Sequence, residues 1–220
     1  SAFHKIGEGC FGVVHAIKSN ITHEYYAVKQ SKVDKLKCKS GHNFTKAQLD
    51  EVLMHKSLSY HPNIVSFLQA WRQDSTLYLL MELCVTSLDD YWMKRRFIYI
   101  VEIELVMDDM LLALQHLGLS NIGHFDLKPA NILRTKTGHY KLADFTVASR
   151  LDKINKGGEF GDGKYAAPEL LNEEFTLKAD VYSLGLTLAK ISAPSSSPLT
   201  SEEWDTLKLE GELPKRVAQG

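Results

Sequence analysis

The first part of the chain alternates short runs of β-branched, aromatic and aliphatic residues with turn-forming residues. Four such runs, over 13–17, 25–29, 64–71 and 77–83, have the length and composition of β-strands. Turn-forming residues at 74–76 separate the last two runs, which indicates a hairpin. The pattern therefore predicts β-strands, the last two of which form a hairpin.

One helix is predicted between the second and third of these strands. Leu49, Val52 and Leu53 recur at helical spacing and define an apolar face, with Glu51 near its edge. Residues 45–48 have the spacing of a capping box, which would start the helix.

The second part of the chain has the periodicity of helices. A long buried helix is predicted from the apolar positions Ile103, Val106, Met107, Met110, Leu111, Leu114 and Leu117. Shorter helices are predicted over 88–97, 179–189 and 204–213, and Asp180 lies in the first turn of the second of these.

The composition excludes several classes of protein. The chain has 220 residues, 44% of them hydrophobic, and a net charge of −1, which argues against disorder and against a general nucleic-acid field. No apolar run is long enough for a membrane segment, and the first residues do not resemble a signal peptide. The lysine-rich stretch 31–44 predicts a loop. No aromatic residues alternate with its lysines, so we expect no nucleic-acid partner.

The cysteines point to a reducing environment. Cys10, Cys38 and Cys84 are odd in number and scattered, and no CxxC pair is present. Neither a zinc site nor a disulfide framework is predicted. An intracellular location fits this usage best.

A chemically distinctive set of polar residues lies between 124 and 144. Asp126, Lys128 and Asn131 fall within six positions, and Asp144 follows a predicted hairpin with its turn at Gly138. We expect these side chains to converge at one end of the hairpin. Phosphoryl transfer uses such a set, because it needs a carboxylate for the hydroxyl proton, an amide and a carboxylate for metal ions, and an ammonium for phosphate charge. The alternative is a polar surface hairpin without chemistry.

A glycine-rich segment near the start, with Gly7, Gly9 and Gly12, is a second candidate phosphate site. Strand-like residues flank it on both sides, whereas a Rossmann unit would open a helix there, and no GxxxxGK[ST] motif is present. Glycines in a hairpin allow backbone amides to approach phosphates. Lys29 ends the following strand, either as an exposed strand lysine or as a phosphate contact.

In this order, the motifs resemble those of the eukaryotic protein kinases. They are the glycine-rich hairpin, Ala27-x-Lys29, the pattern H-x-D-x-K-x-x-N from His124, D-F-x from Asp144, and A-P-E over 167–169. The resemblance covers nearly the whole chain.

This resemblance implies an α+β, bilobal protein-kinase-like fold. An antiparallel β small lobe would span 1–84 and a mainly α-helical large lobe 85–220, with ATP in the cleft and a hinge at 82–85. The resemblance also implies further helices after Leu213 and an Arg that pairs with Glu169, so the large lobe is expected to be truncated at its C-terminus.

The resemblance implies a role for each candidate residue. Lys29 would contact the phosphates of ATP and Glu51 would hold Lys29, with Asp50 as the nearest rival. Asp126 would orient and deprotonate the acceptor hydroxyl, and Lys128 would steady the γ-phosphate. The implied Mg²⁺ ligands are Asn131 and Asp144. The implied ATP-binding residues are Ile6, Gly7, Gly9, Gly12, Val14, Ala27, Lys29, Met81, Glu82 and Cys84.

Within the kinases, the chain looks like the Wee/Myt family, which inhibits cyclin-dependent kinases. Phe125 stands where most kinases carry Arg, and residues 161–171 are similar to the family's G-D-x-R-Y/F-x-A-x-E-L/V-L stretch. Residues 77–84 are similar to the Myt branch and 66–71 to the Wee branch, so the branch stays open. The implied substrate is the glycine-loop tyrosine or threonine of a cyclin-dependent kinase with its cyclin. The implied kinase is a monomer in the nucleus or cytoplasm.

Three features bear on regulation. In kinases the segment between D-F-G and A-P-E, here residues 144–169, is called the activation segment. Without Arg at 125, a phosphate on this segment should have little effect on activity, so we expect the segment to be ordered by its own packing. Thr146 replaces the Gly of D-F-G, and a β-branched residue should restrict the Asp144 loop. Asp180 is expected to hold the backbone of the catalytic loop.

Two other functions remain open from the sequence. Thr146 and the short C-terminus are compatible with a catalytically impaired kinase fold that acts as a binding module. The K-P-x-N-I pattern from Lys128 is shared with initiation-factor-type Ser/Thr kinases. Lys128 itself does not decide whether the acceptor is tyrosine, threonine or serine.

Overall fold

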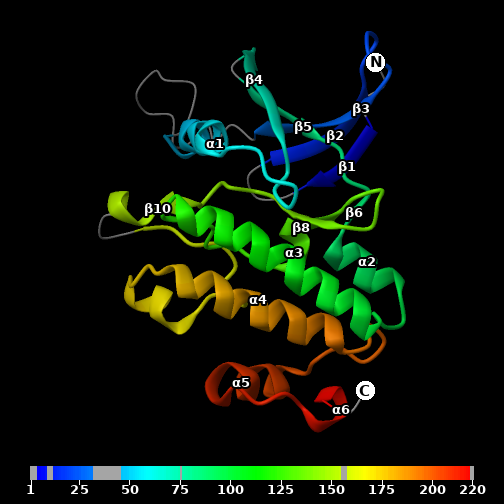
Figure 1. The fold of residues 1–220 in the computed structure, drawn as a ribbon, viewed down its shortest axis with the longest axis vertical. Coiled ribbons are helices and arrows are strands. Elements are labelled where there is room, and N and C mark those ends of the chain that lie inside the picture. The colour runs from blue at the N-terminus through cyan, green and yellow to red at the C-terminus, as the bar shows by residue number, and fades with distance from the viewer. Residues whose placement is uncertain (1–3, 9–11, 32–45, 75, 155–157, 219–220) are drawn as a thin grey trace.

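The computed structural model describes residues 4–8, 12–31, 46–74, 76–154 and 158–218. Gly9, the loop over 32–44 and the cap at Thr45 lie outside these residues. In the described part, a sheet lies at one end of the molecule and the last helices lie at the other (Figure 1).

The predicted antiparallel sheet is present and has five strands in the order β1-β2-β3-β5-β4. The strands are β1 (His4–Glu8), β2 (Gly12–Lys18), β3 (Tyr25–Ser31), β4 (Phe67–Gln73) and β5 (Thr76–Glu82). β3 is central, and its residues Ala27, Val28 and Lys29 are buried. Lys29 therefore lies in the interior, on a strand that pairs with β2 on one side and β5 on the other.

The strand predicted over 64–71 begins later than expected. Val65 N–H donates to the carbonyl of Leu142 (2.9 Å), and Leu142 N–H donates to the carbonyl of Asn63 (2.8 Å). Residues 63–65 are therefore bonded to the β8–β9 hairpin, and contact with β5 begins only at Ser66, whose carbonyl accepts from Glu82 N–H.

Helix α1 (Lys46–Ser57) lies beside the sheet, near β4 (Figure 1). Its buried face differs from the prediction, because Leu49 and Leu53 are about half exposed while Val52 is buried. Glu51 and His55, one helical turn apart, are the other buried residues described on α1. A polar contact therefore sets the rotation of the helix, and apolar periodicity alone does not.

The rest of the described chain is mainly helical. The helices are α2 (Leu88–Lys94), α3 (Ile100–Leu119), α4 (Leu177–Ser192), α5 (Ser201–Glu210) and α6 (Lys215–Ala218). α3 and α4 pack side by side, with α5 and α6 beyond them (Figure 1). The predicted helix over 88–97 ends at Lys94, where the cap Arg95 is extended.

Helix α3 forms the floor of the site. Val106, Met110 and Leu117 are fully buried, as predicted, but Met107 and Leu111 are exposed. The apolar stripe in the sequence is therefore wider than the face of α3 that is buried.

No described helix is long and apolar enough to cross a membrane.

Short strands above α3 carry the catalytic segments. They are β6 (Thr86–Ser87), β7 (Ile122–Gly123), β8 (Ile132–Arg134), β9 (Tyr140–Leu142) and β10 (Ser149–Arg150). β8 and β9 form the predicted hairpin. Gly138 in its turn has a φ of 94°, which glycine adopts without strain.

Candidate active site

The loop between β7 and β8 is anchored from below by Asp180, near the start of α4. Its two carboxylate oxygens accept hydrogen bonds from the backbone N–H groups of His124 and Phe125, both at 2.7 Å. Asp180 is 2% exposed. A buried carboxylate that accepts two backbone donors fixes the loop immediately before Asp126, as the sequence predicted.

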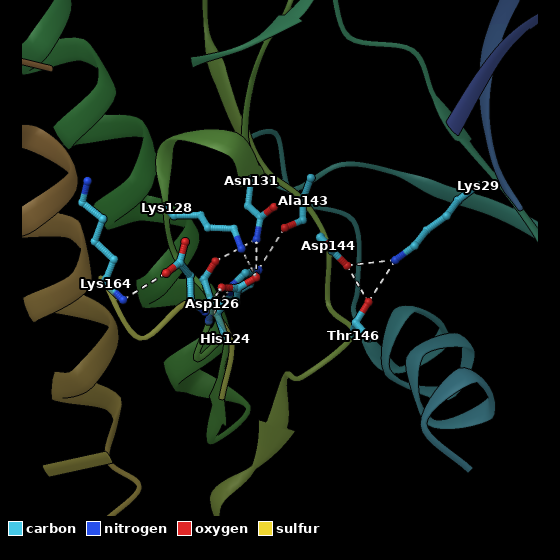
Figure 2. Close-up of polar contacts among 10 residues, drawn as sticks. Lys29, His124, Asp126, Lys128, Asn131, Ala143, Asp144, Thr146 and Lys164 are labelled. Carbon is cyan, nitrogen blue, oxygen red and sulfur yellow. Dashed lines mark hydrogen bonds and ion pairs between the residues drawn. The ribbon is translucent and has the colours of Figure 1, made fainter. Parts of the chain in front are cut away.

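The Asp126 carboxylate is held by three donors (Figure 2). Its Oδ2 accepts from Asn131 Nδ2 (2.8 Å) and contacts Lys128 Nζ (2.9 Å). Its Oδ1 accepts from the backbone N–H of Asp162 (2.8 Å). Asn131 N–H donates to the carbonyl of Lys128 (2.9 Å) in a 3₁₀ turn over Pro129–Asn131, so the proline-stiffened segment folds these side chains together.

A second polar cluster lies where β3, α1 and the segment after β9 meet. Lys29 Nζ donates to Glu51 Oε1 (2.6 Å), to Asp144 Oδ1 (2.9 Å) and to Thr146 Oγ1 (2.9 Å). Asp50, the rival partner in the sequence, is exposed. The cluster joins the sheet to the β8–β9 hairpin, and the N–H of Ala143, next to Asp144, donates to the carbonyl of Asn131 (2.9 Å). The Ala143 carbonyl contacts the His124 ring nitrogen Nε2 (3.0 Å) (Figure 2).

Burial and opposite charges compete within this second cluster. Burial disfavours charge on Lys29, but Asp144 and Glu51 outweigh it and raise the lysine pKa. Burial also opposes ionisation of Asp144, yet Lys29 and the Thr146 hydroxyl hold its pKa at about 2. Lys29 and Asp144 are therefore a charged pair at neutral pH.

The residues predicted to bind ATP lie mostly on one face of the sheet. In the strand register, Val14 is opposite Lys29, Ala27 is opposite Met81, and Gly7 is opposite Val14. Residues two apart on a strand share a face, so these side chains point the same way as Lys29. Ile6 is in β1 where the register shifts, and its side chain is about half exposed.

Gly7 and Gly12 differ in what requires a glycine. A Cβ on Gly12 would lie 2.5 Å from the carbonyl oxygen of Gln30, whereas a Cβ on Gly7 would meet only Val14, at 4.0 Å. Gly12 is therefore required by the close approach of β3, independently of any ligand. Gly7 has no comparably close contact among the described residues.

The predicted hinge has some of its backbone groups engaged. Glu82 N–H donates to the carbonyl of Ser66, and Val85 N–H donates to that of Arg134. The Glu82 carboxylate accepts from Lys141 Nζ (2.7 Å) and from the Ser66 N–H (2.6 Å). Among the described residues, no acceptor takes the N–H of Cys84. Burial raises the pKa of the Cys84 thiol to about 11, so it is a neutral group.

Phe125 lies in an apolar cluster with the activation segment. It is 3% exposed and packs with the buried side chains of Val147, Ala166 and Leu170. Its ring meets Phe175 edge to face, with the ring centroids 5.1 Å apart. Position 125, where the resemblance implied that most kinases carry Arg, is thus surrounded by apolar contacts.

Gly123 allows the Phe125 ring to reach this position. A Cβ on Gly123 would lie 2.1 Å from the ring, and Phe125 has a φ of 58°, which a bulky residue seldom adopts. The surrounding packing therefore holds Phe125 in a conformation that it would not choose in isolation.

Three contributors to the site were not assigned from the sequence. The Thr146 hydroxyl contacts both Lys29 and Asp144, and Gly161 lies so close to Asp126 that a Cβ would be 1.9 Å from its carboxylate. His55 stacks on Phe67 and meets Phe145 edge to face. A hydroxyl two positions after an Asp is a local hydrogen-bonding signal for Thr146. No local pattern reveals the other two.

Asn131 and Asp144 together suit a magnesium ion. Asn131 uses its amide nitrogen toward Asp126, which leaves its carbonyl oxygen for a cation. Asp144 uses Oδ1, and within the described residues no donor reaches its Oδ2. Magnesium in phosphate-transfer sites is bound by few protein oxygens together with the phosphates. The described residues contain no larger His, Cys, Asp or Glu cluster.

The fold is that of a protein kinase. A family model of the protein kinase domain matches residues 1–210, so the chain belongs to that family. Protein kinase domains use ATP and Mg²⁺.

The relatives agree with the more specific resemblance. The membrane-associated tyrosine- and threonine-specific cdc2-inhibitory kinase wee-1.3 of Caenorhabditis briggsae is 34% identical over 98% of this chain and 32% of its own length. The membrane-associated tyrosine- and threonine-specific cdc2-inhibitory kinase of Drosophila melanogaster is 33% identical over 96% of this chain and 39% of its own. The Wee1-like protein kinase of Arabidopsis thaliana is 36% identical over 96% of this chain and 42% of its own length. This chain spans less than half the length of these relatives.

Proposed function

We propose that the chain transfers the γ-phosphoryl group of ATP to a protein hydroxyl. The acceptor would be the inhibitory tyrosine or threonine in the glycine loop of a cyclin-dependent kinase bound to its cyclin. The observation that carries the proposal is the Asp126 carboxylate, fixed by Asn131 and Lys128 and linked through the Asn131–Ala143 hydrogen bond to the Lys29–Asp144 pair.

Asp126 would orient the acceptor hydroxyl and accept its proton. Because Asp180 anchors the loop and three donors fix the carboxylate, little reorganisation is needed when the hydroxyl arrives. The Lys128 ammonium, whose side chain is 22% exposed, can reach a phosphate while it stays within 2.9 Å of Asp126. Its charge would balance the charge on the transferred group.

ATP would lie against the sheet face that carries Val14, Ala27 and Met81, with the backbone of Cys84 facing the base. Lys29, held by Glu51, would contact the phosphates. Asn131 and Asp144 would hold Mg²⁺, which bridges and neutralises phosphate oxygens when it is bound. The division into lobes over 1–84 and 85–220 belongs to this proposal.

The choice of substrate is supported by similarity. Two of the relatives are named as tyrosine- and threonine-specific kinases that inhibit cdc2. The same similarity extends over nearly the whole chain, including the segment 161–169 that borders Asp126. Within this segment, Asp162 N–H donates to the Asp126 carboxylate, so the segment lies beside the proposed acceptor position.

The test is transfer of labelled phosphate from Mg-ATP to a cyclin-dependent kinase whose own catalytic Asp has been mutated. The full chain should label the glycine-loop tyrosine or threonine, and Asp126→Asn should lower the rate by about 10²–10⁴-fold. Unchanged nucleotide binding by Asp126→Asn is the control for folding.

Other outcomes point to other functions. Label on serine or threonine of an unrelated protein, but not on the cyclin-dependent kinase, would support an initiation-factor-type kinase. ATP binding without transfer to any protein would support a binding module and would contradict the proposal.

A further inference from the structure

Thr146 occupies a position at which the kinase pattern has glycine, and its side chain is engaged. Its Oγ1 lies 2.9 Å from Lys29 Nζ and 2.5 Å from Asp144 Oδ1 (Figure 2). The figure shows the three groups as a triangle beside α1, with each atom in contact with the other two. A glycine would supply neither contact.

The direction of each hydrogen bond in the triangle is fixed. A lysine ammonium can only donate, so Thr146 Oγ1 accepts from Lys29. The Thr146 hydroxyl then donates to Asp144 Oδ1, since a carboxylate can only accept. The Glu51 carboxylate is a second acceptor within reach of this hydroxyl. Oδ1 thus receives two donors, whereas within the described residues Oδ2 receives none.

Asp144 needs such support for two reasons. Its φ is 63°, a left-handed conformation that Asp tolerates but does not prefer. The second reason is that the other hydrogen-bond donor to Asp144 is Lys29, which also contacts Glu51 and Thr146. A phosphate that accepts a hydrogen bond from Lys29 would compete with Asp144 for that donor.

We propose that the Thr146 hydroxyl is a positioning group for Asp144. It keeps Oδ1 engaged when Lys29 turns toward the phosphates, so that Oδ2 stays available to the metal ion. This inference rests on the proposed function, because it assumes that Lys29 and Asp144 serve Mg-ATP. Thr146 then supports the chemistry, although it departs from the family pattern.

The test compares Thr146→Val, which keeps the shape but lacks the hydroxyl, with Thr146→Ser, which keeps the hydroxyl. Thr137→Val, in the exposed β8–β9 turn, is the matched control. ATP binding is measured by calorimetry with and without Mg²⁺, and the Mg²⁺ dependence of phosphoryl transfer is measured in parallel.

Mg²⁺ raises the affinity of a kinase for ATP by some factor, and we expect this factor to be about tenfold smaller for Thr146→Val than for the parent. A loss of this size corresponds to one hydrogen bond to a charged group. Its metal-free ATP affinity should change by less than about twofold, and Thr146→Ser should stay within about threefold of the parent. Thr137→Val should match the parent throughout. A purely structural role would lower both affinities together.

Four results would overturn the inference. The first three concern Thr146→Val: a Mg²⁺ dependence equal to that of the parent, a loss of both affinities together, or tighter binding of Mg-ATP, which would mean that the hydroxyl restrains Asp144. In these three cases the proposed function survives if the parent still transfers phosphate. If the parent binds Mg-ATP without transferring phosphate, only the proposed function fails. If the parent binds no nucleotide, both fail.

Discussion

The catalytic loop region is held by a polar joint and by an apolar joint. The polar joint is Lys29, Glu51, Asp144 and Thr146, and it connects the sheet, α1 and the segment after β9. The apolar joint is Phe125 with its cluster, and it connects the catalytic loop to the activation segment and the start of α4. Both join segments that are far apart in the sequence.

The difference between the joints reflects what each must do. A buried ion pair costs nearly as much in desolvation as it gains in attraction, so the polar joint contributes placement more than stability. Under the proposed function, its hydrogen bonds are also exchanged for bonds to phosphate. An apolar cluster has no such alternative partner and contributes stability through burial. We therefore expect the polar joint to control turnover and the apolar joint to control order.

The largest expected effect comes from breaking the apolar joint. Phe125→Ala removes a ring that is 3% exposed and leaves a cavity among Val147, Leu170 and Phe175. We expect a loss of about 3–5 kcal/mol in the free energy of unfolding, measured by urea denaturation. Activity should fall with it, because the activation segment loses its contact with the catalytic loop.

Phe125→Leu is the matched control for this prediction. It keeps most of the apolar surface and should cost roughly 1 kcal/mol. If Phe125→Ala and Phe125→Leu were equally stable, the cluster would not be the support that we assign to it.

The next effect concerns the histidine that backs the polar joint. His55 lies one turn after Glu51, and its ring packs between Phe67 and Phe145. Burial lowers its pKa from 6.5 to about 4, with the nearby Lys29 charge adding to the effect. Its Nε2 has no hydrogen-bond partner among the described residues. The folded protein therefore favours the neutral form of the His55 ring.

The sign of the pH dependence follows from the lowered pKa. The unfolded chain binds a proton on His55 below pH 6.5, while the folded chain binds it only near pH 4, so stability falls as pH drops through this window. Between pH 7 and 5 the loss is roughly 2 kcal/mol. Urea denaturation across this range should show a flatter profile for His55→Leu than for His4→Leu, which alters an exposed histidine in β1. Equal slopes would contradict the prediction.

The parts that the sequence predicted best are local. Asp126, Lys128 and Asn131 lie within one short loop, and Gly138 marks the hairpin that follows. Their proximity depends on a few backbone angles that proline and glycine restrict. The sheet was predictable where consecutive strands pair, as in β1–β2, β2–β3 and β4–β5. The pairing of β3 with β5 instead of with β4, the next strand along the chain, is not local.

The parts that could not be predicted depend on distant partners. The rotation of α1, which buries His55 and exposes Leu53, is set by the pairing of Glu51 with a strand lysine 22 positions earlier. The surroundings of Phe125 come from residues 147–179, which no periodicity connects to it. Thr146 was identified as a departure from a pattern, but its contacts follow only from the position of Lys29.

The smallest expected effect is that of removing phosphate. Between 144 and 169 the chain carries only three hydroxyl residues, Thr146, Ser149 and Tyr165. Tyr165 is 6% exposed against Trp204, Thr146 is hydrogen-bonded in the polar joint, and Ser149 pairs with Gly123 in β10. No cation stands at 125 to receive a phosphate on any of them.

Phosphatase treatment of the full chain should therefore change its activity by less than about twofold, because packing and not charge orders the segment. Two hydrogen bonds already connect the segment to the loop that carries Asp126. Gly161 N–H donates to the carbonyl of Phe125 (2.9 Å), and Asp162 N–H donates to the Asp126 carboxylate (2.8 Å). Mass spectrometry should confirm that the treated protein carries no phosphate, and a sample with inhibited phosphatase is the control. A loss of most activity, restored by rephosphorylation, would show that charge orders the segment and that Phe125 does not replace it.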